Sequence, residues 1–309
     1  MNTPDPHRRG APAAATMLWI TSVWGLCFLA IRLGLQDAPA LAALRALIAA
    51  GALLLLCLIQ GRGIPRGRRI WALITLMGIV NVTVAFAAMF AGTAGMAIGA
   101  AAVLANAQPL LIILPAWWIY GEAVSMRTVF GIMAGFAGLL VVGVASGGGT
   151  GAWLSVLAAA AVTAGTLLSR ALRDVDLVAA AAWHFLIGGL LLAGMAALNE
   201  PGAAINWSPQ FLAVLLFLSL AGTAAAFLAW FREAGRSRLD LLTAWTLLVP
   251  VMGVAVSLFL PGERPTPWAA AGTGLVLGSL WLVLHQPDGR TVQGKVTKDS
   301  DTGSREGQE

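Results

Sequence analysis

The second half of this chain repeats the first. When Pro109 is set on Pro250, a constant offset of 141 residues also brings Gly121-Glu122 onto Gly262-Glu263. A repeat of domain size decides the architecture before any local pattern does. If each copy holds an odd number of membrane spans, the two copies take opposite orientations in the membrane.

Ten hydrophobic runs of bilayer length fill both halves. The chain is 59% hydrophobic and only 11% charged, whereas an average soluble domain is about a quarter charged. A spanning helix needs roughly 20 mostly apolar residues. The sequence therefore predicts an all-α polytopic membrane protein, with ten transmembrane helices as two inverted five-helix repeats around a central cavity. The runs are 16–35, 40–60, 70–90, 94–119, 127–145, 151–169, 177–198, 208–231, 239–260 and 267–285.

Polar segments mark the expected boundaries. Residues 1–15 precede the first repeat, 16–145, which holds helices 1 to 5. A Gly-rich linker, 146–151, leads to the second repeat, 152–285, which holds helices 6 to 10. The tail 286–309 is rich in Gly, Ser, Thr, Lys and Asp and is predicted to be disordered, because it cannot bury a core.

The basic residues predict the orientation. With the N-terminus in the cytoplasm, the outer side receives only Arg32, Arg45 and Arg264 of the 19 lysines and arginines. Cytoplasmic loops carry the excess of positive charge in membrane proteins. Both termini are therefore expected in the cytoplasm. The low lysine and high alanine, glycine and arginine content favours a bacterial cytoplasmic membrane.

Two sets of short motifs recur in the two halves. They are Gly92-Thr93-Ala94, Asn106-Ala107-Gln108-Pro109, Gly121-Glu122 and Gly131, then Ala221-Gly222-Thr223-Ala224, Leu248-Val249-Pro250, Gly262-Glu263 and Gly272. Together with Trp24-Gly25 in the first predicted span and Arg45 in the second, these motifs resemble the EamA domain of the drug/metabolite transporter superfamily. The resemblance covers about residues 16–285. It implies a ten-helix bundle that moves small metabolites through a cavity lined mainly by helices 1, 3, 4, 6, 8 and 9, and it does not give the substrate.

Pro109 and Pro250 are predicted inside helices 4 and 9 at equivalent positions. Proline lacks the backbone donor and clashes with the carbonyl four residues back, here those of Ala105 and Thr246. Such carbonyls need partners or a wet cavity within the membrane. Moving hinges beside the cavity and static kinks both remain open.

Arg45 and His184 are ionisable residues within spans. Setting Asp37 on Asp176 brings them to equivalent positions, with Arg45 near the outer face and His184 near the inner face. Buried charge usually marks a pathway or a partner. One hypothesis pairs Arg45 with Glu263 and His184 with Glu122 as alternating gates. In the other, Arg45 snorkels to the surface and His184 contacts a helix carbonyl.

Further candidates for lining the cavity are polar or aromatic residues at depth. Amides and hydroxyls can hydrogen-bond a zwitterion, and tryptophan rings can hold an aromatic or cationic group. The alternative for each is ordinary contact between helices. The candidates are Trp24, Asn81, Asn106, Gln108, Thr163, Thr223, Trp245 and Thr246.

Small residues at a spacing of four predict close helix contacts. Glycines so spaced let two helix backbones approach. Packing within the bundle is expected at Gly95-x-x-x-Gly99, Gly131-x-x-x-Gly135 and Gly274-x-x-x-Gly278.

These features favour a secondary transporter, an exporter of small organic metabolites such as amino acids or related amphiphiles, by alternating access between the repeats. The alternatives are a membrane-embedded enzyme and a non-transporting scaffold. The three histidines are far apart and the two cysteines lie in apolar runs, so no catalytic residue, metal site or cofactor is predicted. The expected partners are a small-molecule substrate and lipid, not nucleic acid. Protons are a candidate coupling ion, through His184. A monomer is favoured.

Overall fold

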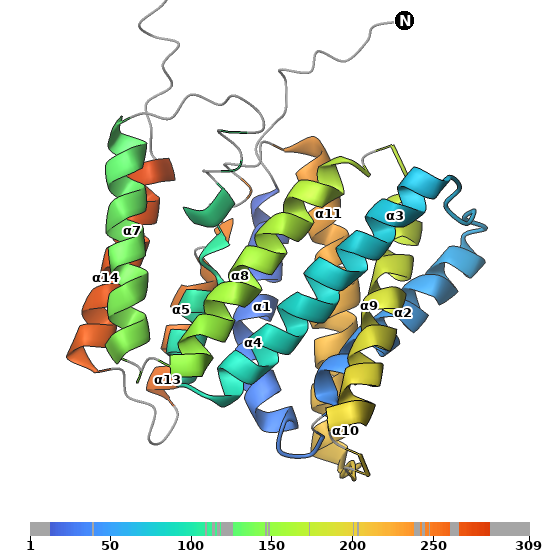
Figure 1. The fold of residues 1–309 in the computed structure, drawn as a ribbon, viewed down its shortest axis with the longest axis horizontal. Helices are drawn as coiled ribbons and strands as arrows, with labels where there is room; N and C mark the ends of the chain where they lie inside the picture. The colour runs from blue at the N-terminus through green and yellow to red at the C-terminus, as the bar shows by residue number, and fades with distance from the viewer. Residues whose placement is uncertain are drawn as a thin grey trace, which may run out of the picture.

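The computed structural model is all-helical over the part of the chain that it describes, as the sequence predicts. In chain order the elements are α1 (Ala14–Gly34), α2 (Leu41–Ile59), α3 (Arg68–Met77), η1 (Gly78–Val84), α4 (Ala85–Ala94), α5 (Ile98–Ala105), α7 (Met126–Ala145), α8 (Gly149–Arg170), α9 (Leu177–Asn199), α10 (Pro209–Leu216), η2 (Phe217–Ala225), α11 (Ala226–Arg236), α13 (Leu248–Leu258) and α14 (Pro267–Leu284) (Figure 1). The described residues are 13–38, 40–108, 110–112, 115, 118, 126–145, 147, 149–172, 174–199, 201–202, 204–237, 242, 245–246, 248–259 and 266–284.

Six described helices are long and apolar enough to cross a membrane. In two of them, consecutive segments continue one another: α3, η1 and α4 form one span, and α10, η2 and α11 form another. Two shorter apolar segments that are largely helical, Ile98–Ile112 and Val129–Ala145, add to the six. The prediction of ten spans goes beyond these helices and stays a prediction. The six are Ala14–Gly34, Leu41–Ile59, Arg68–Ala94, Gly149–Arg170, Leu177–Asn199 and Pro209–Glu233.

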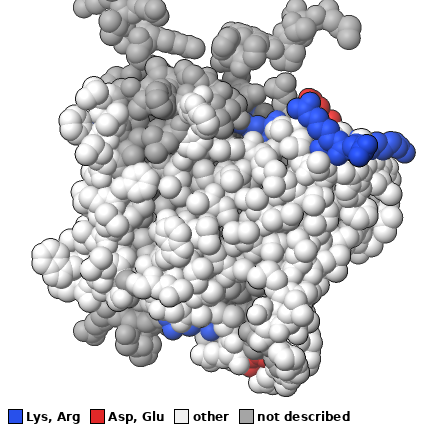
Figure 2. Space-filling view, viewed as in Figure 1, with Lys and Arg blue, Asp and Glu red and all other residues white. Residues whose placement is uncertain are grey.

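Charged side chains gather at two opposite edges of the face shown in Figure 2, with a broad uncharged band between them. The larger basic group lies at the edge where α3 begins (upper right). Large apolar side chains such as Leu140, Leu190 and Leu275 point outward. An apolar belt between charged edges is the surface that a bilayer requires, because charge is costly in hydrocarbon.

The two halves of the chain pack on each other through equivalent helices. Helix α2 packs against α9, α5 against α13, and α7 against α14. The last pair lies side by side at the left of Figure 1. Other helices also pack against the opposite half of the chain: α1 packs on η2, and α8 packs on α4 and η1. The buried apolar residues form two clusters, and each cluster contains residues of both halves.

Glycines set the closest helix crossings. An ideal Cβ on Gly138 of α7 would lie 2.9 Å from the Gly272 carbonyl oxygen of α14, and one on Gly272 would lie 3.0 Å from the Gly138 oxygen. A Cβ on Gly274 or Gly278 meets no described atom within 4 Å. The predicted contact through Gly274 and Gly278 is therefore wrong, because the rotation of α14 turns Gly272 toward α7 and these two glycines away from it.

Two loop contacts join the halves at equivalent places. Asn206 donates from its backbone N–H to the Asp37 carbonyl (2.9 Å) and from Nδ2 to Asp37 Oδ1 (2.8 Å). Arg62 Nη1 lies 2.5 Å from Asp176 Oδ2, with both side chains about one-third exposed. Asp176 also caps α9, because its Oδ1 accepts from the Ala179 N–H at 2.9 Å.

The two roles of Asp176 can be separated by substitution. We expect Asp176→Ala to destabilise the protein by about 1 kcal/mol, since the N-cap bond is lost. Asp176→Asn keeps a capping oxygen, and Arg62→Ala removes only an exposed ion pair, so each should cost about 0.5 kcal/mol or less. Thermal unfolding of the three purified variants in one detergent checks the order. Equal losses for Asp176→Ala and Asp176→Asn would contradict the capping role.

Candidate functional site

The fourth predicted span is broken beside two of the candidate residues. Helix α5 ends at Ala105, and Asn106 and Ala107 lie outside helical conformation before the chain is helical again at Gln108. Asn106 Nδ2 donates to the Ala102 carbonyl at 2.8 Å. Gln108 is buried and its Nε2 donates to Thr166 Oγ1 of α8 at 2.8 Å. Gln108 therefore joins the first half of the chain to the second.

A matching break lies in the second half. Thr246 is in a turn whose carbonyl accepts from the Val249 N–H at 3.0 Å, and α13 begins at Leu248. Pro250 is thus the third residue of α13 rather than a residue inside a longer helix. The first four N–H groups of a helix have no intrahelical acceptor, so proline loses nothing there. The prediction that Pro250 kinks a continuous helix is corrected accordingly, while Pro109 lies outside the described residues.

The π-helical segments η1 and η2 occupy the same place in the third and eighth predicted spans. Thr83 Oγ1 donates to the carbonyl of Gly78, five residues earlier, at 3.3 Å, and to the carbonyl of Gly188 on α9 at 3.2 Å. Thr223 Oγ1 donates to the carbonyl of Leu218, again five residues earlier, at 2.7 Å. π-helical turns are rare and frequently lie at functional sites. Nothing in the hydropathy of the sequence predicted them.

Arg45 is buried between the halves, with 2% of its surface exposed. Its Nε donates to Thr223 Oγ1 at 2.6 Å, and its Nη2 donates to the Gly222 carbonyl at 3.2 Å. Its guanidinium carbon lies 4.6 Å from the ring centre of Phe86 and 5.8 Å from that of Phe90. Arg45 therefore does not snorkel to the surface, because η2 and the two rings hold it inside the bundle.

The Gly222 carbonyl is a meeting point of three helices. Trp24 Nε1 of α1 donates to it at 3.2 Å, beside the bond from Arg45 of α2. A Cβ at Gly222 would lie 2.6 Å from Cys27 Sγ, so a larger residue here would have to displace the Cys27 side chain. The Trp24 ring lies 5.5 Å from that of Phe227. We name Trp24, Arg45, Phe86, Gly222 and Thr223 the Arg45 cluster.

The Arg45 cluster leaves one nitrogen of the guanidinium without a hydrogen bond. Nη1 is buried and has no acceptor. Among the described residues no carboxylate forms an ion pair with Arg45, whose partners are a hydroxyl, a carbonyl and two ring faces. Glu263, the partner that the gate hypothesis assigns to Arg45, lies outside the described residues.

His184 is fully buried at the equivalent place in α9. Its Nδ1 lies 3.0 Å from the Ala180 carbonyl, one turn earlier, which is the contact that the structural alternative expects. Nε2 has no partner. The ring packs against those of Phe185 (4.3 Å) and Phe231 (6.1 Å). Glu122 lies outside the described residues, so the proposed gate pair stays a prediction.

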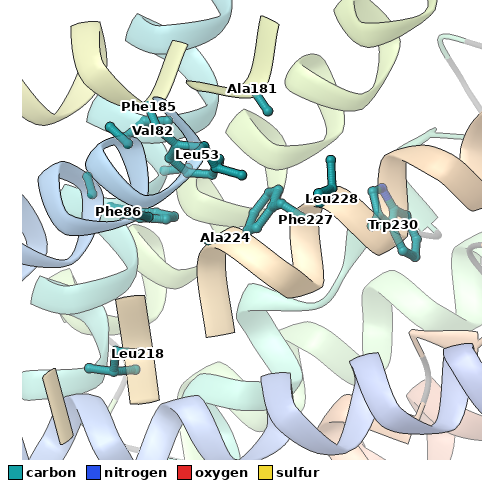
Figure 3. Packing of buried hydrophobic residues seen from close by; sticks show 14 of the residues in the cluster. Leu53, Val82, Phe86, Ala181, Phe185, Leu218, Ala224, Phe227, Leu228 and Trp230 are labelled. Atoms are coloured by element: carbon teal, nitrogen blue, oxygen red, sulfur yellow. The ribbon is translucent and has the colours of Figure 1, made fainter. Parts of the chain in front are cut away.

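Aromatic rings connect these two buried residues. The ring centre of Phe185 lies 6.2 Å from that of Phe86 and 5.2 Å from that of Phe227. Figure 3 shows Phe86, Phe185 and Phe227, which come from three different helices, converging on one apolar core. A continuous row of aromatic rings thus runs from Phe86, beside Arg45, to Phe185, beside His184.

The other residues predicted to line the cavity make contacts outside the Arg45 cluster. Asn81 is buried against Gly165 of α8, whose added Cβ would lie 2.5 Å from Asn81 Oδ1. Thr163 donates to the Ala159 carbonyl of its own helix at 2.7 Å. Trp245 packs against the core and Thr246 is buried. The structure thus brings Trp24 and Thr223 together with Arg45, and it brings Asn81 and Gln108 separately to α8.

The sequence did not reveal the ring partners of Arg45 or the shared Gly222 carbonyl. The sequence did contain a signal for the Gly222 carbonyl, because Gly222-Thr223 belongs to a motif that carries the family resemblance. No signal pointed to Phe86 and Phe90. They lie one helical turn apart in an apolar run, where phenylalanine is ordinary.

Comparison with known proteins gives one consistent result. Residues 12–144 and 149–285 each match the EamA-like transporter family. A WAT1-related chloroplast protein of Arabidopsis thaliana is 28% identical over 282 residues, covering 86% of this chain and 67% of its own. A probable amino-acid metabolite efflux pump of Salmonella typhimurium is 25% identical, covering 86% of this chain and 92% of its own.

A protein of known crystal structure has the same fold. It superposes with a TM-score of 0.66 at 22% identity, over 88% of this chain and 96% of its own. Together with the apolar helices, the twofold family match identifies an integral membrane protein. The chain belongs to the EamA-like transporter family, two copies of whose domain account for nearly all of it.

Proposed function

We propose that this protein is a secondary transporter that exports small organic metabolites, such as amino acids or related amphiphiles, by alternating access between two halves. The observation that carries the proposal is the contact between the halves, which joins buried polar side chains. Arg45 of the first half bonds Thr223 of the second, and Gln108 bonds Thr166. Polar groups buried in spans usually mark a pathway. The names of relatives, which include amino-acid metabolite efflux pumps of Salmonella typhimurium and Escherichia coli, favour export.

The proposed architecture has ten spans, with 16–145 and 152–285 as inverted halves joined by the linker 146–151. The breaks beside Asn106 and Thr246 support it, since transporters with inverted repeats often bind substrate at broken helices. The basic edge where α3 begins supports cytoplasmic termini, namely 1–15 and the tail 286–309, in a bacterial cytoplasmic membrane.

The test is uptake and counterflow in proteoliposomes, with a panel of amino acids and related metabolites, in the presence and absence of a proton gradient. Saturable flux is the expected result. Flux that responds to the gradient would assign protons as the coupling ion, and flux indifferent to it would assign a facilitator or exchanger. Correctly inserted protein that moves no member of the panel would contradict the proposal.

A further inference from the structure

We infer that Arg45 is the receptor for a carboxylate group of the transported molecule. This inference rests on the proposed transport function and names a chemical class within it. It follows from two facts about Arg45: the side chain is almost completely buried, and one of its nitrogens has no hydrogen-bond partner.

A buried guanidinium needs a countercharge. Removal of an ion from water is costly, and buried charges are ordinarily paired. The partners of Arg45 are the Thr223 hydroxyl, the Gly222 carbonyl and the faces of Phe86 and Phe90, all of them uncharged. Among described residues no carboxylate reaches it. Within the described part of the chain, the Arg45 charge and its Nη1 donor are thus left without a counterion inside the bundle.

The arrangement of donors favours a carboxylate as the missing partner. Thr223 and Gly222 hold Nε and Nη2, which fixes the plane of the guanidinium and leaves Nη1 free. Planar guanidinium groups recognise carboxylates with well-directed, charge-assisted hydrogen bonds. A single positive charge balances one carboxylate, whereas a phosphate dianion would keep an excess negative charge among the rings of Phe86 and Phe90. Those rings favour an apolar or aromatic body on the same ligand.

The equivalent residue of the second half provides a matched control. His184 is as deeply buried as Arg45 and also has an unpartnered nitrogen, but its other ring nitrogen contacts the Ala180 carbonyl. Arg45 carries a permanent charge, and histidine does not. A general need for a polar group at this depth would affect both residues alike, whereas selection for a carboxylate depends on Arg45.

The experiment compares acids with their uncharged carboxamides. Purified full-length protein is titrated with the common L-amino acids, with their carboxamides, and with 3-phenylpropionate against 3-phenylpropionamide, and thermal stabilisation gives the affinities. The same compounds then compete for counterflow in proteoliposomes. The parental protein should prefer the acid of the best-bound pair by about tenfold or more. Arg45→Gln should abolish the preference, Arg45→Lys should weaken it, and His184→Gln should leave the ratio at the parental value.

The outcomes separate the two claims. Acids that bind selectively but do not move would overturn transport and support the Arg45 site. Flux in which amides compete as well as acids would support transport and overturn the site. Retention of the acid preference by Arg45→Gln would also overturn it. If Arg45→Gln is not monodisperse in detergent, Arg45→Lys decides, because an undiminished preference in that variant contradicts recognition by the planar guanidinium.

Discussion

Replacement of Gly188 by valine is expected to prevent stable folding. A Cβ at Gly188 of α9 would lie 2.4 Å from the Val82 Cβ and 2.5 Å from the Gly78 carbonyl oxygen, both in η1. A backbone oxygen cannot rotate away as a side chain can. Overpacking typically costs about 1–3 kcal/mol and occasionally more, and a clash with a backbone oxygen places Gly188→Val at the upper end, which is a large part of the stability of an ordinary domain. Size-exclusion chromatography in detergent and thermal unfolding should show aggregation or a much lower midpoint.

Gly194, on the same helix, is the matched control. A Cβ there meets no described atom within 4 Å, and the residue is exposed on the outer surface. Gly194→Val should therefore unfold near the parental temperature, since valine is somewhat more favourable than glycine within a helix. If both variants behaved alike, the close crossing of α9 and η1 would be refuted.

The second large loss of stability is expected from replacement of Thr223. Thr223→Val has nearly the same shape but removes the oxygen that accepts from Arg45 Nε at 2.6 Å. A buried charged donor then loses its partner, which costs about 1.5–3 kcal/mol. Thr83→Val, at the equivalent place in η1, removes only bonds to carbonyls, for which membrane proteins average about 0.6 kcal/mol. Unfolding midpoints of the two variants should therefore differ clearly.

Thr223→Ser supplies the rescue. Serine restores the hydroxyl while it omits the methyl group, so it should recover most of the loss caused by valine. Since Thr223 also fixes the guanidinium plane, Thr223→Val should reduce transport more than Thr83→Val does. Equal destabilisation by Thr223→Val and Thr83→Val would argue against a charged bond at Thr223.

The helices themselves were predictable from the sequence. The runs 16–35 and 177–198 correspond to Ala14–Gly34 and Leu177–Asn199 within two residues. In a membrane every backbone group must be bonded within the segment, so run length alone predicts a helix. The sequence placed Arg45 and His184 within spans, but it left open whether the Arg45 side chain is buried or snorkels to the surface, because both outcomes fit a charge near the end of an apolar run.

The interruptions of the helices were not predictable. The break beside Asn106 and the segments η1 and η2 change which carbonyl each N–H reaches, and they leave the hydropathy of the run unchanged. The failure at Gly274 and Gly278 has a related cause. Sequence spacing tells which residues share a face of one helix, but the neighbouring helices decide which face is turned inward.

The π-helical segments also alter the direction in which side chains point. A π-helical turn takes up one residue more than an α-helical turn, and each residue of an α-helix accounts for about 100° of rotation around its axis. Residues before and after η2 therefore face directions that differ by about that angle from those of an uninterrupted helix. The α-helical segments on the two sides of η2 are thus rotated relative to each other about the axis of the span. Phe211 of α10 and Phe227 of α11 both face the core, although residues this far apart would not share one face of an uninterrupted α-helix.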